Sequence, residues 1–240
     1  MNPSTSSTKG TRFLKFTIIF ILLSGFCAHQ KMQLPKELSM NSYNIAICPI
    51  IYNFTVGPAA AGVYPQTVET TTKEISDHIR NALEEDFTNK GITALFIPEE
   101  KLSIQQTEEL FKRANKIGEI VTFTAAEQEV FKEEGFPNLI LLLSGRSFSE
   151  TEESYNQRIK TSCASAALIT VLTLGCLIGI PTAHSVDYTY FDTVVIHRPD
   201  GRILWRDNIN WGGQVYNPKT VSDIVKTLIS RFLTSGAERS

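Results

Sequence analysis

Few side chains in this sequence have the types and spacing that catalysis or metal binding requires. The four histidines are scattered along the chain, and the four cysteines include no Cys-x-x-Cys pair. Structural zinc sites usually show such close ligand spacing. The nucleophile motif Gly-x-Ser-x-Gly, the phosphate-binding glycine loops and His-Glu-x-x-His are also absent from the sequence. We therefore expect no metal, no cofactor and no catalytic residue, and a protein that is not an enzyme.

Neighbouring acids and histidines are the next candidates for chemistry, and each has a simpler interpretation. Asp77 and His78 fall on the outward face of a predicted helix, whereas a catalytic dyad needs a convergent pocket. His197 is expected on the surface. The acidic clusters are expected on solvated faces and loops; they are Glu84-Glu85-Asp86, Glu133-Glu134 and Glu150–Glu153. An envelope hydrolase is therefore the least favoured of the functions considered.

The amino terminus predicts export. Met1–Lys15 carries three basic residues and no acid, and the apolar stretch Phe16–Ala28 follows it directly. A basic region followed by a short apolar region is the layout of a secretory signal. This apolar stretch is shorter than the roughly 20 residues that a membrane-spanning helix needs. Residues 1–27 are therefore predicted to be a signal peptide, and an uncleaved anchor is the alternative.

Cys27 lies where the apolar stretch ends and is the predicted lipidation site. Leu22-Leu23-Ser24-Gly25-Phe26-Cys27 resembles a bacterial lipobox, in which the cysteine is lipidated and becomes the new amino terminus. It departs from that pattern at Phe26, where a small residue is usual, and in the distance from leucine to cysteine. Ordinary cleavage after Cys27 is the alternative. With lipidation, several acyl chains would hold the protein to a membrane, and residues 28–43 would form a tether.

A second uncharged apolar segment, residues 161–183, has three interpretations. It is part of the core, it dips into the lipid beside the anchor, or it crosses the membrane. A crossing would separate the following hairpin from the other strands, and a lone hairpin is marginal in water. Cys163 and Cys176 would be about 20 Å apart on one helix, beyond the roughly 4.4–6.8 Å that a disulfide allows. They can pair only if the segment folds back on itself.

The remaining pattern predicts an α/β (α+β) fold: a single domain over residues 44–234, with a mixed sheet flanked by helices and a C-terminal β-hairpin and helix. The stretch Asn53–Gln66 is predicted to be an irregular loop, and Ser149–Lys160 is a polar stretch that precedes the second apolar segment. Ser103 and Thr124 are the predicted helix N-caps. The predicted strands are Asn44–Tyr52, Ile92–Ile97, Asn138–Phe148, Asp187–His197 and Arg202–Asn210. The predicted helices are Thr70–Lys90, Leu102–Ile117, Thr124–Glu134 and Asn217–Leu233.

Charge and aromatic content limit the class of partner. The net charge of −2 gives no electrostatic reason for nucleic-acid binding. The hairpin concentrates aromatic residues, and Tyr188, Tyr190, Trp205 and Trp211 are a possible interaction surface. Core packing is the alternative, because alternation along a strand turns half of such residues inward. The hairpin pattern also places Ile203 and Trp205 on one face.

Three segments together resemble small bacterial envelope lipoproteins. They are residues 44–50, residues 141–146, and the apolar segment and hairpin at residues 174–181, 188–196 and 199–204. The order of elements is similar to the periplasmic α/β domain of the curli secretion channel lipoprotein and the amino-terminal domain of the Tol translocation protein. The resemblance implies an outer-membrane lipoprotein that faces the periplasm and binds protein partners, assembles with itself or acts as a scaffold. A pore or secretion-apparatus subunit that inserts residues 161–183 in an oligomer is the alternative.

Overall fold

The structure, a computed structural model, describes residues 44–58, 64–116, 120–161, 187–212 and 217–237. The predicted signal peptide with Cys27 and the tether at residues 28–43 lie outside these residues. So does the apolar segment 161–183 beyond Thr161, together with Cys163 and Cys176. Among the helices that are described, none combines the length and the apolar character that a membrane crossing needs.

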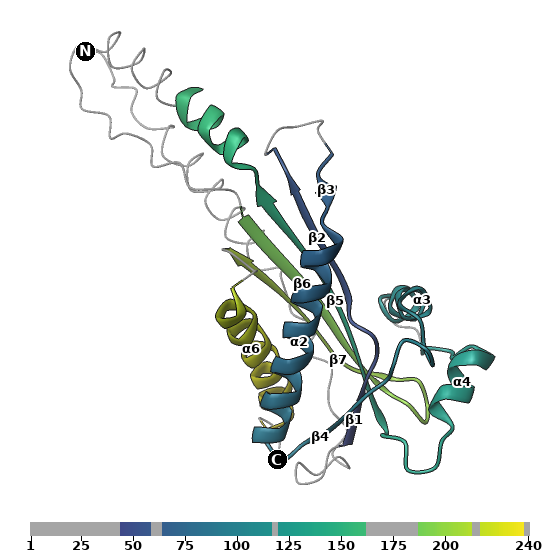
Figure 1. Cartoon of the computed structure of the whole chain (residues 1–240). Helices are drawn as coiled ribbons and strands as arrows, with labels where there is room; N and C mark the ends of the chain where they lie inside the picture. The colour runs from purple at the N-terminus through teal and green to yellow at the C-terminus, as the bar shows by residue number, and fades with distance from the viewer. Residues whose placement is uncertain (1–43, 59–63, 117–119, 162–186, 213–216, 238–240) are drawn as a thin grey trace, which may run out of the picture. The chain divides into compact units, whose positions relative to one another are not determined.

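Strand β5 is the centre of a mixed sheet (Figure 1). Its first edge pairs with β6 antiparallel along its whole length, and β7 continues the sheet beyond β6. Its second edge pairs in parallel first with β1 and then with β2. On the outer side, β4 pairs with β1 and β3 pairs with β2. The strands are β1 (Asn44–Ile47), β2 (Ile51–Gly57), β3 (Gln66–Thr67), β4 (Thr93–Phe96), β5 (Leu139–Glu150), β6 (Asp187–His197) and β7 (Ile203–Gly212).

Strands β1 and β2 follow one path along β5, interrupted at residues 48–50. Ile47 pairs with Leu141 and Ile51 with Ser144, so four steps on one strand match three on the other. One extra residue of this kind makes a β-bulge. The single strand predicted at Asn44–Tyr52 is therefore wrong in two ways: it breaks at Cys48-Pro49-Ile50, and it resumes as far as Gly57 inside the predicted loop Asn53–Gln66.

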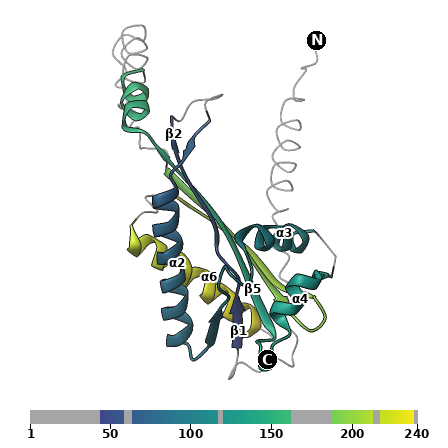
Figure 2. The same cartoon turned by 45° about the vertical axis from the view of Figure 1, so that its right-hand side comes forward.

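Helices cover both faces of the sheet (Figure 2). Helices α2 and α6 pack on one face with β5 residues Leu139, Leu141 and Leu143, while α3 and α4 pack on the other with Ile140 and Leu142. This alternation along β5 is expected for a strand buried on both sides. The mixed sheet flanked by helices, with a C-terminal hairpin and helix, is thus confirmed. The helices are α2 (Glu69–Asn89), α3 (Ile104–Ala114), α4 (Ala125–Phe131) and α6 (Pro218–Ala237).

Local signals in the sequence give the helix starts correctly. Ser103 accepts a hydrogen bond from the Gln106 amide, and the Gln106 side chain accepts one from the Ser103 amide. Thr124 and Glu127 form the same reciprocal arrangement at α4. Each capping box satisfies two N–H groups that a helix end leaves open. Both predicted caps are confirmed, although α3 and α4 end earlier than predicted.

Two acids expected on solvated faces are buried instead. Glu150 is 8 % exposed at the end of β5, where the Arg158 guanidinium donates to its Oε2 at 2.7 Å. Asp86 is also 8 % exposed, on α2. The sequence places both acids in acidic runs, and burial was not visible from those runs. Residues 152–161 are helical, which brings Arg158 back toward Glu150.

A bulge in the hairpin changes which residues share a face. Val195 pairs with Trp205 but Ile196 pairs with Ile203, so Leu204 is the extra residue. Trp205 therefore packs in the core beneath α2 and α6, whereas Ile203 packs under α3 and α4. The prediction that Ile203 and Trp205 lie on one face is wrong, because simple alternation does not survive a bulge.

We expect Thr193→Val to stabilise the protein by about 1 kcal/mol. Thr193 is 2 % exposed beside a small apolar cavity under α2 and α6, and its hydroxyl has no hydrogen-bond partner among the described residues. Valine has the same shape without the unsatisfied hydroxyl. Urea unfolding of the full chain in detergent measures the change.

The control is Thr189→Val on the same face of β6. The Thr189 hydroxyl is hydrogen-bonded to Ser147 Oγ at 2.9 Å, so this variant is expected to lose stability. Equal effects of the two substitutions would show that the missing partner of Thr193 has no energetic consequence.

Candidate functional site

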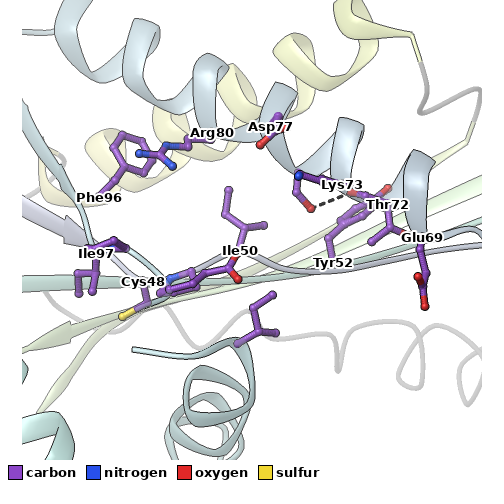
Figure 3. A pocket seen from close by; sticks show the side chains of 15 residues that line it. Cys48, Ile50, Tyr52, Glu69, Thr72, Lys73, Asp77, Arg80, Phe96 and Ile97 are labelled. Carbon is purple, nitrogen blue, oxygen red and sulfur yellow. Dashed lines mark hydrogen bonds between the residues drawn. The ribbon is translucent and has the colours of Figure 1, made fainter. Parts of the chain in front are cut away.

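A groove of about 480 Å³ lies at the outer edge of the sheet, where β1 and β4 end. Parallel strands present their carboxyl ends at one edge, and open α/β sheets commonly bind ligands there. Residues 48–52 form its floor, α2 forms one wall, and the segment from Phe96 to the start of α3 forms the other (Figure 3). The lining comes from three segments far apart in the sequence.

The wall contributed by α2 is charged and the opposite wall is largely apolar. Glu69, Lys73, Asp77 and Arg80 follow one another along α2, so the sign of the charge alternates along the groove. The Arg80 guanidinium carbon lies 4.9 Å from the centre of the Phe96 ring, a cation–π contact. Ile97, Pro98 and Ile104 line the other side, and Ile104 is 40 % exposed. Such a mixed lining suits binding through apolar contacts with polar orientation.

Burial raises the pKa of the two ionisable side chains on the groove floor, Cys48 and Tyr52. Burial raises the pKa of the Cys48 thiol, and the Glu127 carboxylate raises it further. Burial also raises the pKa of Tyr52 to about 12, although the hydrogen bond with Ser147 acts in the opposite direction. Both groups are therefore neutral near pH 7. Cys48 is 1 % exposed and packs as a small hydrophobic residue.

Cys48 is expected to resist alkylation in the native protein, even at pH 8. Thiolate is the reactive form of cysteine, and a raised pKa keeps Cys48 protonated. Iodoacetamide labelling of the full chain, followed by peptide mapping, should leave the Cys48 peptide unmodified until the protein is unfolded in urea. Native labelling at the rate of a free thiol would contradict the assigned burial.

A second candidate surface lies on β5 and β6, on the face that α3 and α4 cover farther along. We call Arg146, Phe148, Tyr188 and Tyr190 the tyrosine patch. Arg146 pairs across the strands with Tyr190, and Phe148 with Tyr188. The Arg146 guanidinium carbon lies 5.1 Å from the centre of the Tyr190 ring, and the rings of Phe148 and Tyr188 stack at 5.5 Å.

Hydrogen bonding fixes the patch further. Tyr190 Oη donates to Asp192 Oδ1 at 2.8 Å, and Tyr190 is half-buried. Burial raises the pKa of Tyr190, and the bond to Asp192 raises it further. Tyr188 remains 43 % exposed. The patch therefore exposes one aromatic side chain, Tyr188, whose ring is held in place by stacking on Phe148.

The four aromatic residues proposed from the sequence do not form one surface. Tyr188 pairs with Gly212 and Tyr190 with Asn210, whereas Trp211 pairs with Thr189 and so lies on the opposite face. Trp205 shares that opposite face and is 5 % exposed in the core. Core packing, the alternative interpretation, therefore holds for Trp205. Which of these four residues share a face depends on the register of the hairpin, and the sequence pattern alone does not give that register.

The histidine and acid candidates are not brought together. His78 is exposed on α2, while Asp77 lines the groove. His197 Nδ1 lies 2.6 Å from Asp200 Oδ1 within the hairpin turn, a contact local to that turn. In the described part of the chain, no cluster of three potential metal ligands occurs. For the groove, the local signal in the sequence is a proline shortly after each of two strands, Pro49 after β1 and Pro98 after β4, because proline ends strand pairing and both prolines line the groove.

Comparisons with known proteins give likeness of structure only. No family model matches the chain, and no curated protein matches it in sequence. Protein XCC0632 from Xanthomonas campestris, of family DUF330, is 8 % identical with a TM-score of 0.43, covering 86 % of this chain and 93 % of its own. The PelC dodecamer from Paraburkholderia phytofirmans is 8 % identical, with a TM-score of 0.33 and coverage of 82 % and 94 %. Lipoprotein GNA1162 from Neisseria meningitidis is 10 % identical, with a TM-score of 0.30 and coverage of 79 % and 96 %.

These structural neighbours are bacterial proteins and include one lipoprotein. Their identities and TM-scores are too low to carry an argument about this chain. The resemblance to the curli and Tol proteins stays a prediction from the sequence.

Proposed function

We propose that this chain is a bacterial envelope lipoprotein, tethered through Cys27 and residues 28–43, whose α/β domain binds a protein partner and is not an enzyme. The outer membrane, with the domain in the periplasm, is the proposed location. The observation that carries the binding role is the tyrosine patch, where the exposed Tyr188 ring stacks on the buried Phe148 ring. The lipobox-like sequence that ends at Cys27 supports the tether.

The composition of the patch fits protein recognition. Tyrosine and arginine are among the residues that most often dominate the energy of interfaces. The stacked Phe148 ring and the Asp192 carboxylate already hold Tyr188 and Tyr190 in place, so a partner would pay little conformational entropy to order them. A partner that offers an apolar surface with a hydrogen-bond acceptor would match this patch.

The tether is tested by Cys27→Ser in the native host. We expect the wild-type protein to fractionate with membranes and its amino-terminal peptide to carry the mass of a lipid-modified Cys27. The variant should lose that modification and most of its membrane fraction, since several acyl chains are needed for stable anchoring. An unmodified amino terminus at Ala28 or His29 would overturn the lipoprotein assignment. Membrane association that survives Cys27→Ser would instead implicate residues 161–183 if the amino-terminal peptide shows that residues 1–27 were removed, and the uncleaved stretch Phe16–Ala28 if they were kept.

The binding role is tested separately, by placing a photo-crosslinking amino acid at position 188. We expect one discrete crosslinked product in the native host, and none from the same amino acid at position 64. Tyr64 is the matched control because it is a tyrosine that is 92 % exposed and lies outside the patch. A product with a second copy of the chain would favour self-assembly, including the pore or secretion-subunit alternative. Equal crosslinking from both positions would reject the patch.

A further inference from the structure

We infer that the groove between α2 and α3 binds an extended polypeptide segment from a partner protein, which adds to the sheet as a short strand. The groove is separate from the tyrosine patch. The inference rests on the proposed binding role of the domain and adds the form that one bound partner takes.

The outer edge of the β1–β2 path is only partly paired. Strand β4 pairs with β1 as far as Ile47, and β3 pairs with β2 only at Thr55 and Val56. Just beyond these ladders, the Ile97 amide donates to Ile47 O and the Val68 amide donates to Phe54 O. In the described part of the chain, no strand pairs with this edge between those two points. Within that gap, residues 51–53 belong to β2 and present about 10 Å of strand, while residues 48–50 form the irregular break.

The backbone on this edge is oriented for pairing. Phe54 directs both of its backbone groups outward, because its N–H donates to Thr72 Oγ1 at 3.1 Å and its C=O accepts from Val68. Successive residues of a strand alternate in the direction of these groups. The N–H and C=O of Tyr52, two residues before Phe54 on β2, therefore point to the same side. Exposed edges of this kind are templates for another strand.

The groove provides the room that such a strand needs. Figure 3 shows Lys73, Asp77 and Arg80 along α2, across the groove from the segment that carries Ile50 and Tyr52. The volume of about 480 Å³ lies directly over the unpaired edge, and its lining includes Tyr52 at one end and Ile97 at the other. A segment that pairs with this edge would therefore lie between two walls.

The walls predict the character of the bound segment. Side chains of an added strand would alternate between the two sides of the sheet. One set would face the alternating charges of α2, and the other would face Ile104 and Pro98. We therefore expect a segment that alternates polar and apolar residues. Backbone bonds supply affinity in this mode of recognition, and pockets for alternate side chains supply specificity.

The test uses the full chain in detergent and a phage-displayed library of random heptapeptides as the probe. We expect selected peptides to alternate polar and apolar residues and to bind at least tenfold more weakly to Ser76→Trp. Ser76 lines the groove from α2, so the indole would fill it without replacing a core residue. His78→Trp is the matched control, because it adds the same side chain on the exposed side of the same helix.

Two further measurements identify strand addition. Hydrogen exchange should slow at the Tyr52 amide when a selected peptide binds, and methylation of alternate peptide nitrogens should abolish binding in one register only. Peptides that bind both tryptophan variants equally, or that leave exchange of the Tyr52 amide unchanged, would overturn the inference.

A second copy of the chain is the competing occupant. If the chain self-associates, and Ser76→Trp abolishes this association while His78→Trp does not, the occupant of the groove is a second copy of the chain and not a segment of a partner protein. Because this test needs neither lipidation nor the tyrosine patch, its outcome is independent of the crosslinking and fractionation tests.

Discussion

Replacing Gly145 with alanine is expected to lower the free energy of unfolding by about 3 kcal/mol, the upper part of the range for overpacking a core. Gly145 lies between Tyr52 on β2 and Phe191 on β6, which are its cross-strand partners. A methyl group there would lie 2.5 Å from the Phe191 ring and 2.6 Å from the Tyr52 ring. Both rings are buried, at 1 % and 8 % exposure, so neither can swing aside freely.

Urea unfolding of the full chain measures this effect, with Gly212→Ala on β7 as the control. A methyl group on Gly212 meets no atom of the described residues within 4 Å, so that variant should keep the stability of the wild type. Phe191→Leu in the Gly145→Ala background should recover part of the loss, because the smaller side chain yields space. Additive losses in the double variant would show that the clash is not the cause.

The absence of a side chain at Gly145 also lets Tyr52, on the floor of the groove, pack against Phe191. The rings of Tyr52 and Phe191 close over it with their centres 5.8 Å apart. Tyr52 Oη is hydrogen-bonded to Ser147 Oγ, which in turn lies 2.9 Å from Thr189 Oγ1. These hydrogen bonds join β2, β5 and β6. Core packing therefore fixes the position of Tyr52 on the groove floor.

Features that depend on neighbouring residues could be predicted from the sequence. The stripe of Ile75, Ile79, Leu83 and Phe87 on α2 is buried as its helical spacing predicts. The caps at Ser103 and Thr124 were equally local. The central apolar strand was also predicted, because a run such as residues 139–143 is typical of a strand covered on both faces.

Features that depend on register or on distant segments could not be predicted. The bulges at residues 48–50 and at Leu204 each shift the pairing by one residue, and hydrophobic periodicity does not reveal them. The groove assembles residues 48–52, 69–80 and 96–104, which meet only once the strand order is known. Glu150 illustrates the same limit, because its burial depends on the return of Arg158.

Replacing Arg113 with methionine is expected to cost about 3 kcal/mol, because it leaves a buried carboxylate without its main partner. Glu127 is 2 % exposed, and Arg113 Nη2 donates to its Oε1 at 2.5 Å and its Oε2 at 2.7 Å. The remaining bond to Glu127, from the Thr124 amide at 2.8 Å, satisfies only part of that carboxylate. Urea unfolding of the full chain measures the loss.

The decisive comparison is the double variant Arg113→Met with Glu127→Gln. Glutamine keeps an oxygen that can accept from the Thr124 amide but carries no charge, so the double variant should be more stable than Arg113→Met alone. Such recovery is the signature of an unpaired buried charge, because replacing both members of a buried pair often costs less than removing one. Equal or greater instability of the double variant would instead assign the loss to packing of the Arg113 side chain against the α3–α4 layer.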